Sequence, residues 1–125
     1  MASVSFGCAV DDAALGERIF QDGLGSDGRV AYEQGPSWLR HSASGCAACH
    51  GRDGEGRTVR AGAVVGSAPP LTAAALAARG YDEASLLAAI TTGVDPLGRP
   101  LNTYMPRWHF TQREARALLH YLEHL

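Results

Sequence analysis

The chain has 125 residues, 46% of them hydrophobic, and a formal net charge of −2 at pH 7. This length fits one domain that can bury a core. All eleven cationic residues are arginines, which excludes a surface of flexible lysines, and the slightly negative charge argues against a nucleic-acid-binding protein. No apolar run approaches the roughly 20 residues that a helix needs to span a membrane.

Residues 1–10 are expected to form a flexible tail, or to stand in place of a removed leader. The opening MASVSFGCAVDD lacks the basic and apolar regions of an intact secretion signal. Ser5 and Phe6 do not make a good lipobox before Cys8. We therefore expect Cys8 to be a free thiol rather than a lipid anchor.

A helix is predicted to follow the tail. Asp11 and Asp12 supply its start, and Gly23 or Gly25 its end. The next stretch, LGSDGRVAYEQGPSWLRHSASG, is punctuated by glycine, serine and proline. Within it, RVAY fits a short strand and PSWLRH fits a turn of helix.

Three further helices are predicted in the second half of the chain. Thr72 and Asp82 are N-caps, Gly93 is a stop signal, and Thr111 with Glu114 forms a capping box. We expect helices over 72–80, 82–93 and 112–125, and loops over 51–70 and 94–106. Such long loops are hard to stabilise by packing alone, so we expect something besides side chains to fill the centre.

The stretch GCAACHG, Gly45 to Gly51, holds two cysteines three residues apart and a histidine directly after the second. Cysteines at i and i+3 lie on one side of a helical turn, so both sulfurs can reach one edge of a flat macrocycle. The histidine can then bind an iron at the centre of the ring. The motif C-x-x-C-H is typical of covalent haem c attachment, here through Cys46 and Cys49, with His50 as an iron ligand.

Zinc binding and disulfide exchange are the rival interpretations of this motif. A zinc site needs four ligands, and Cys8 with the scattered histidines offers no compact second pair, although His120 and His124 lie four residues apart. A thioredoxin-type motif needs a strand that leads into the helix, and HSASG before Cys46 is not a strand. The sequence therefore favours haem.

A six-coordinate iron needs a second axial ligand from elsewhere in the chain. Methionine raises the reduction potential, and apart from Met1 the chain has only Met105. It lies in NTYMPRW, where Pro106 stiffens the backbone beside it. The alternatives are a core role for Met105, ligation by His41 or His109, and an iron with an open position. We expect Met105 to be the ligand.

With these motifs the chain resembles class I c-type cytochromes of the bacterial single-haem kind, over most of residues 11–125. The family places Gly-x-x-x-aromatic on its first helix, here Gly16 and Phe20, and Leu-x-x-Tyr on its last, here Leu118 and Tyr121. The two helices cross there, and glycine allows the close approach. The resemblance implies an all-α cytochrome c fold, with four to five short helices and long loops around one covalently bound haem.

The resemblance also implies a partner for the motif histidine. The family keeps Pro-x-Leu after the haem motif, and PPL gives Pro69 and Leu71, with Pro70 as the alternative proline. The Pro69 carbonyl would accept the Nδ1–H of His50, which fixes the tautomer and strengthens the imidazole as a ligand. The stretch TGVDPLGRPLNTYMP is similar to the methionine-bearing loop of many bacterial members.

One departure from the family is the long connection between the first helix and the haem motif. We interpret residues 24–44 as an insertion within a single domain over 11–125. With Tyr32, Trp38 and Arg40, this insertion either packs over a haem edge or forms a surface for a partner.

Other side chains near the motifs have more than one interpretation. Trp108 either contacts the haem, by packing or by donating its indole N–H to a propionate, or is plain core. The arginines near the motif and the Met105 loop form a mixed solvated surface, an anion-binding patch, or a propionate partner. Asp53 and Glu55 interleave with them, which favours the solvated surface. These arginines are Arg52, Arg57, Arg60, Arg99 and Arg107.

The resemblance implies single-electron transfer by one haem c, between periplasmic or membrane redox protein partners, without a catalytic site of its own. Two alternatives stay open: a haem module of a larger dehydrogenase or oxidase complex, and a ligand-binding haem sensor with a labile sixth ligand. The family attaches haem in the periplasm, so we expect a periplasmic protein, as a monomer.

Overall fold

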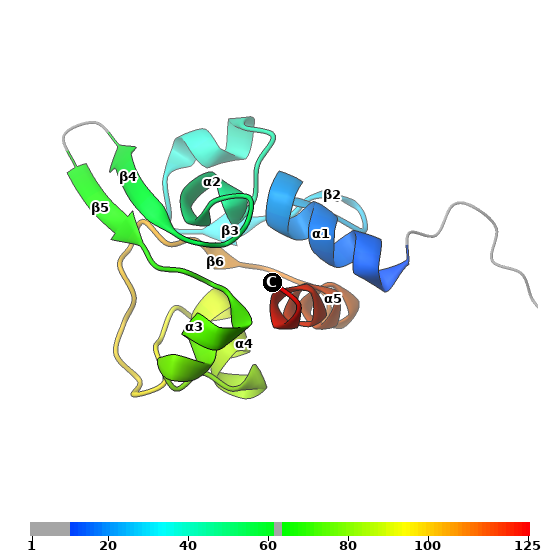
Figure 1. The fold of residues 1–125 in the computed structure, drawn as a ribbon. Coiled ribbons are helices and arrows are strands. Elements are labelled where there is room, and N and C mark those ends of the chain that lie inside the picture. The colour runs from blue at the N-terminus through cyan, green and yellow to red at the C-terminus, as the bar shows by residue number, and fades with distance from the viewer. Residues whose placement is uncertain (1–10, 62–63) are drawn as a thin grey trace, which may run out of the picture.

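Five α-helices and one 3-10 helix form most of the regular structure in the computed structural model, which describes residues 11–61 and 64–125 (Figure 1). The predicted helices are present, and PSWLRH forms the expected helical turn. The expectations for residues 1–10, Cys8 included, lie outside the described residues. The helices are α1 (Asp12–Asp22), η1 (Ser37–His41), α2 (Ala47–His50), α3 (Ala73–Ala78), α4 (Glu83–Thr91) and α5 (Gln112–Glu123).

The first and last helices begin at the capping residues that the sequence predicts. The Asp11 side chain accepts a hydrogen bond from the Ala14 backbone N–H at 2.8 Å and opens α1. Gly23 ends α1 in the left-handed conformation, with a φ of 70°. Thr111 and Glu114 form the reciprocal capping box that opens α5. Local sequence therefore sets these ends.

Helices α1 and α5 cross in close contact, as the resemblance implies (Figure 1). At the crossing, a Cβ on Gly16 would collide with the carbonyl oxygen of Ala117 and would lie 2.9 Å from the Tyr121 Cβ. One turn further along α1, the Phe20 ring packs on Tyr121 with centroids 5.3 Å apart. The crossing at this distance requires glycine at position 16.

Short antiparallel ribbons connect the helices. Strand β1 (Leu24–Gly25) pairs with β2 (Gly28–Arg29), and β3 (Tyr32–Glu33) pairs with β6 (Arg107–Trp108). The predicted strand at RVAY is confirmed only in part, because its two ends fall in different ribbons. The β3–β6 pairing brings the segment after α1 beside the end of the long loop that precedes α5.

The stretch 51–70 is not a loop throughout, so that prediction was wrong. Strands β4 (Arg57–Ala61) and β5 (Val64–Ala68) form an antiparallel hairpin that projects from the rest of the molecule (Figure 1). The segments RTVRA and VVGSA are rich in β-branched residues, whose strand preference outweighs the flanking glycines.

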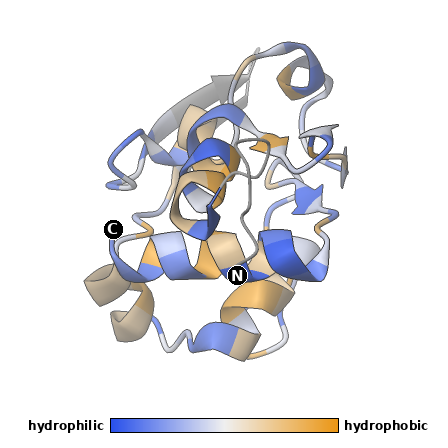
Figure 2. Ribbon diagram, turned by 90° about the vertical axis from the view of Figure 1, so that its right-hand side faces the viewer, coloured by the Kyte–Doolittle hydropathy of each residue, from blue (hydrophilic) through white to orange (hydrophobic). Residues whose placement is uncertain are grey.

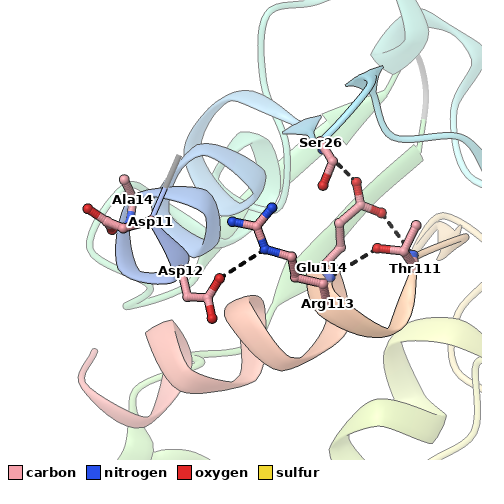
Figure 3. Close-up of polar contacts among 7 residues, drawn as sticks. All are labelled: Asp11, Asp12, Ala14, Ser26, Thr111, Arg113 and Glu114. Atoms are coloured by element: carbon pink, nitrogen blue, oxygen red, sulfur yellow. Dashed lines mark hydrogen bonds and ion pairs between the residues drawn. The ribbon is translucent and has the colours of Figure 1, made fainter. Parts of the chain in front are cut away.

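A buried carboxylate ties the segment after α1 to the start of α5 (Figure 3). The Glu114 carboxylate accepts hydrogen bonds from the backbone N–H of Ser26 at 2.7 Å and from that of Thr111 at 2.9 Å. Burial alone would raise the pKa of Glu114, but these hydrogen bonds outweigh burial and lower the pKa below its usual value. The charged form of Glu114 is therefore part of the folded structure.

One hydrophobic cluster fills the space between the helices. Helix α1 contributes Leu15, Ile19 and Phe20, and α5 contributes Leu118 and Leu122. The helices carry both hydrophobic and hydrophilic residues, as expected for elements with one buried face (Figure 2). Within the described residues, none of the helices has the length and apolar character needed to cross a bilayer.

Candidate haem site

Helix α2 carries the two cysteines of the C-x-x-C-H motif on one turn. Cys46 is its N-cap residue, and the His50 backbone N–H donates to the Cys46 carbonyl at 3.0 Å. Gly45 packs against α1, because a Cβ there would collide with the carbonyl oxygen of Ile19. Cys46 and Cys49 are both partly buried and unpaired. The fold therefore presents two thiols, one helical turn apart, from a helix anchored on α1.

Both thiols are held in the neutral form. Burial raises the pKa of Cys46 to about 12, and burial also raises the pKa of Cys49, against the opposing effect of the Arg57 guanidinium. Disulfide exchange and zinc binding both use the thiolate, and redox motifs lower the pKa of the attacking cysteine. In the described residues, the one group of side chains close enough to share a metal ion contains neither cysteine. The raised pKa values argue against a disulfide-exchange motif, and the grouping of side chains gives the cysteines no further zinc ligands in the described residues.

His50 is buried and its ring is oriented by a backbone carbonyl. Its Nδ1 lies 2.7 Å from the carbonyl oxygen of Pro69, which is the hydrogen bond that the resemblance implies. Burial lowers the pKa of His50, the Pro69 hydrogen bond opposes this, and the positive charge of Arg79 lowers it further. The neutral imidazole therefore has Nδ1 as donor, which leaves the Nε2 lone pair free for a metal.

The β4–β5 hairpin is what returns the chain to His50. The Gly56 backbone N–H donates to the His50 carbonyl at 2.7 Å before β4, and the Leu71 N–H donates to the Gly54 carbonyl at 2.6 Å after β5. Arg57 on β4 adds hydrogen bonds to two carbonyls of α2. These contacts close the stretch into a loop whose end places the Pro69 carbonyl against the imidazole.

Met105 lies in the loop between α4 and β6, partly buried against the central cluster. Cys46 and Leu71 pack against the same cluster, and Trp108 belongs to it. The structure therefore gathers predicted residues from three distant stretches of the chain around one hydrophobic cluster. His109 instead points outward, where its Nε2 lies 2.7 Å from a carboxylate oxygen of Glu33 at the surface.

A buried arginine holds the Met105 loop in place. The Arg107 guanidinium donates to the carbonyl oxygens of Met105 at 2.5 Å, Asn102 at 2.9 Å, Leu101 at 3.0 Å and Gly93 at 3.4 Å. Gly93 is required for this, because a Cβ there would occupy the place of the guanidinium. The Gly93 and Asn102 carbonyls also accept backbone hydrogen bonds, from Leu101 and Met105, so one side chain links four carbonyls of the loop.

Arg107 corrects the prediction that the arginines near the motifs form a solvated surface. It is 9% exposed, whereas Arg99 in the same loop is exposed and pairs with Asp95 at 2.9 Å. Sequence reasoning missed its role because Arg107 and Arg99 look alike in the sequence. Its burial depends on carbonyls from several parts of the loop, so no local signal in the sequence marks it.

The segment between α1 and α2 supports the Met105 loop from outside. The Gly35 backbone N–H donates to the Thr103 carbonyl at 2.9 Å, and Gly35 packs tightly on Pro106. In the same segment, Tyr32 is buried and donates its hydroxyl to the Pro36 carbonyl at 2.5 Å, while Trp38 is 43% exposed. This segment therefore packs against the Met105 loop and presents the Trp38 side chain to solvent.

Trp108 is buried in the central cluster with an unsatisfied donor. Its ring packs on Tyr32, with centroids 5.2 Å apart, and on Phe110 at 6.4 Å. In the described part of the chain, its Nε1 has no hydrogen-bond partner. A buried donor without a partner costs free energy of about 1–3 kcal/mol, so it marks a place where an acceptor from outside the chain belongs.

The residues of this region fit a covalently held haem. Two unpaired cysteines on one helical turn suit two thioether bonds, and the free Nε2 of His50 and the Met105 sulfur are ligands that iron accepts. The Trp108 indole N–H matches a propionate oxygen, and Leu71, partly buried, adds apolar surface.

One protein-family model matches most of the chain. The family model described as Cytochrome c matches residues 25–125, which include every residue assigned to the site. No curated protein and no solved structure matches the chain. The predicted fold class is thereby confirmed, with the short strands described above added to the helices and loops. Covalently bound haem c and haem-based electron transfer follow from the match. The chain belongs to the cytochrome c family.

Proposed function

We propose that this protein carries single electrons on one haem c, attached through Cys46 and Cys49, with His50 and Met105 as the axial ligands. One observation carries the proposal: the side chain of His50 and the loop of Met105 are each held by partly buried hydrogen bonds to backbone carbonyls. Ligands fixed in this way need no rearrangement when the iron changes its charge.

Bound haem supplies a one-electron iron couple. The chain's own residues set the conditions for that couple. The Pro69 carbonyl keeps the Nδ1 proton of His50 in place, so that the ring stays neutral and Nε2 stays available. The Met105 sulfur and the apolar side chains of Leu71, Leu86 and Leu87 exclude water and favour the less charged, reduced iron.

The fixed methionine loop supports a carrier over a sensor. A sensor requires a sixth ligand that leaves the iron readily. Arg107 binds the Met105 carbonyl directly, and the Gly35 N–H holds the neighbouring Thr103 carbonyl. These contacts restrain the backbone of the loop on both sides of Met105, so the proposed ligand is held in a loop with little freedom to move.

We propose that electrons pass to redox protein partners beside the Met105 loop. Leu97 is 76% exposed and Tyr104, next to Met105 in the chain, is 38% exposed, so this loop presents large hydrophobic side chains to solvent. Transient electron-transfer complexes use small interfaces, below about 1,200 Å². We also propose a periplasmic location, where haem attachment takes place in this family.

The proposal is tested on protein matured with its haem. We expect an intact mass equal to the chain plus one haem, and a potentiometric titration that fits one reversible one-electron couple. A colourless protein with the mass of the bare chain would overturn the proposal. Size-exclusion chromatography of native extracts separates a free carrier, which elutes alone, from a subunit that co-elutes with an enzyme.

A further inference from the structure

A cluster of metal-ligating side chains lies at the end of α5, among residues that the proposed function does not use. His120, Glu123 and His124 occupy positions i, i+3 and i+4, so they share one face of the helix. One ligand atom from each lies within 4.8 Å of the others, and all three side chains are exposed. The two imidazole rings have centroids 4.6 Å apart.

The tautomer of His124 is set for metal binding. Its Nδ1 lies 2.9 Å from the backbone carbonyl oxygen of His120, which therefore accepts the Nδ1 proton. This hydrogen bond leaves the Nε2 lone pair free. Metal-binding histidines commonly donate their second ring N–H to a carbonyl in this way, which fixes the ring and increases its basicity.

The surroundings favour a cation. His124 is the C-cap of α5, where the helix dipole is negative. A surface hollow of about 390 Å³ borders the cluster, lined by His120 and Glu123. Asp12 and Glu83 add two further carboxylates to this hollow, but Asp12 pairs with the Arg113 guanidinium at 3.0 Å. The carboxylates of Glu83 and Glu123 then stand against the single guanidinium of Arg116 in the lining. The local charge is therefore negative beside the imidazoles.

We propose that His120, Glu123 and His124 form a second metal site, distinct from the haem iron, that binds a borderline transition-metal dication such as Zn²⁺. Two imidazole nitrogens and one carboxylate are ligands that suit Zn²⁺ and Cu²⁺, whereas Mg²⁺ and Ca²⁺ prefer oxygen ligands alone. Three protein ligands leave coordination positions for water or for a ligand from another molecule. Small rotations of exposed side chains bring the ligand atoms from their present separation to bonding distance.

The test is a titration of the haem-loaded protein with Zn²⁺ by isothermal calorimetry, in a Cys8→Ser background that removes a competing thiol. We expect one Zn²⁺ per chain, with affinity reduced at least about tenfold by His120→Ala or His124→Ala, and to a smaller degree by Glu123→Gln. The matched control is His41→Ala, which removes an exposed histidine outside the cluster and leaves the affinity unchanged. Mg²⁺ in place of Zn²⁺ should bind far more weakly.

Three results would overturn the proposal. They are an unchanged Zn²⁺ affinity in the His120→Ala, His124→Ala double variant, an equal affinity for Mg²⁺, or no saturable binding by the parent protein. The haem spectrum of each variant is recorded in parallel, so that a folding defect is distinguished from loss of the metal site. A haem site that fails its own tests leaves this inference intact, because the two share no ligand.

Discussion

The histidine side and the methionine side of the proposed haem site are built in different ways. On the histidine side, Cys46, Cys49 and His50 lie on one helical turn, and the Pro69 carbonyl that orients His50 comes from the next hairpin. On the methionine side, the ligand lies in a long loop whose shape depends on a buried arginine and on a segment far away in the sequence.

This difference separates the covalent attachment of the haem from the ligation of its iron by Met105. The histidine side is specified by a contiguous motif, so changes there are expected to remove the cofactor. The methionine side is specified by tertiary hydrogen bonds centred on Arg107, so changes there are expected to keep the cofactor and loosen one ligand. The four predictions that follow test this separation, from the largest expected effect to the smallest.

Replacing both motif cysteines, Cys46→Ala with Cys49→Ala, should abolish covalent haem, because no other sulfur lies on α2. The measurement is the intact mass together with a haemochrome assay of the purified chain. Cys8→Ser is the matched control and should retain a full complement of haem. A double variant that still carried covalent haem would disprove attachment through this motif.

Arg107→Leu should destabilise the protein by about 3 kcal/mol, because it removes four hydrogen bonds and leaves the partly buried Leu101 and Met105 carbonyls without donors. Covalent haem should be retained while ligation by Met105 weakens. Denaturant unfolding and the ferric spectrum measure the two effects. Arg99→Leu, in the same loop but exposed, should cost less than about 1 kcal/mol. Equal costs for the two variants would show that Arg107 does not hold the loop.

Gly35→Ala tests the support from the segment between α1 and α2. Gly35 has a φ of 71°, and a Cβ there would lie 2.9 Å from the Cγ of Pro106. Gly98 has a φ of 81° with nothing near its missing Cβ, so Gly98→Ala carries the backbone cost alone, about 1 kcal/mol. We expect Gly35→Ala to cost about 1 kcal/mol more in urea unfolding. If the two costs are the same, the contact with Pro106 is unimportant.

The hydrogen bonds of the Glu114 carboxylate, which join the segment after α1 to the start of α5, should make stability depend on pH. The pKa of Glu114 is lowered in the folded protein, so its contribution is fully present above the unfolded pKa, about 4.3, and is lost as pH falls through the folded value. Glu114→Gln should therefore remove part of the stability loss between about pH 5 and pH 3, on the order of 1 kcal/mol. The measurement is a set of unfolding curves for the parent protein and for Glu114→Gln at both pH values. A variant that kept the full pH dependence of the parent would contradict this prediction.

The same difference explains what the sequence could predict. Capping residues such as Thr111 and Glu114 act on their own neighbours, so the start of α5 could be located from sequence. The pairing of His50 with Pro69 was available from the resemblance, because both lie in recognisable motifs. Arg107 was not, because its burial depends on carbonyls gathered from positions 93 to 105, and nothing local distinguishes it from Arg99.

The hairpin was missed for a related reason. Glycines at both ends of 51–70 predict loop, but the strand preference of the residues between them is satisfied by their pairing with one another. Pairing of β3 with β6 joins segments far apart in the chain, and no local pattern reports such a contact. Sequence reasoning therefore recovered the features that depend on neighbouring residues, and it missed the contacts between residues far apart in the chain.

The central claim is that Met105, held in its loop by Arg107, is the sixth ligand of a haem whose fifth ligand is His50. The most direct test is the near-infrared spectrum of the ferric protein, recorded with a redox titration. We predict the charge-transfer band of methionine bound to ferric iron in the parent protein. In Met105→Ala we predict loss of that band and a midpoint potential lower by on the order of 0.1 V. An unchanged spectrum and potential in Met105→Ala would contradict the claim.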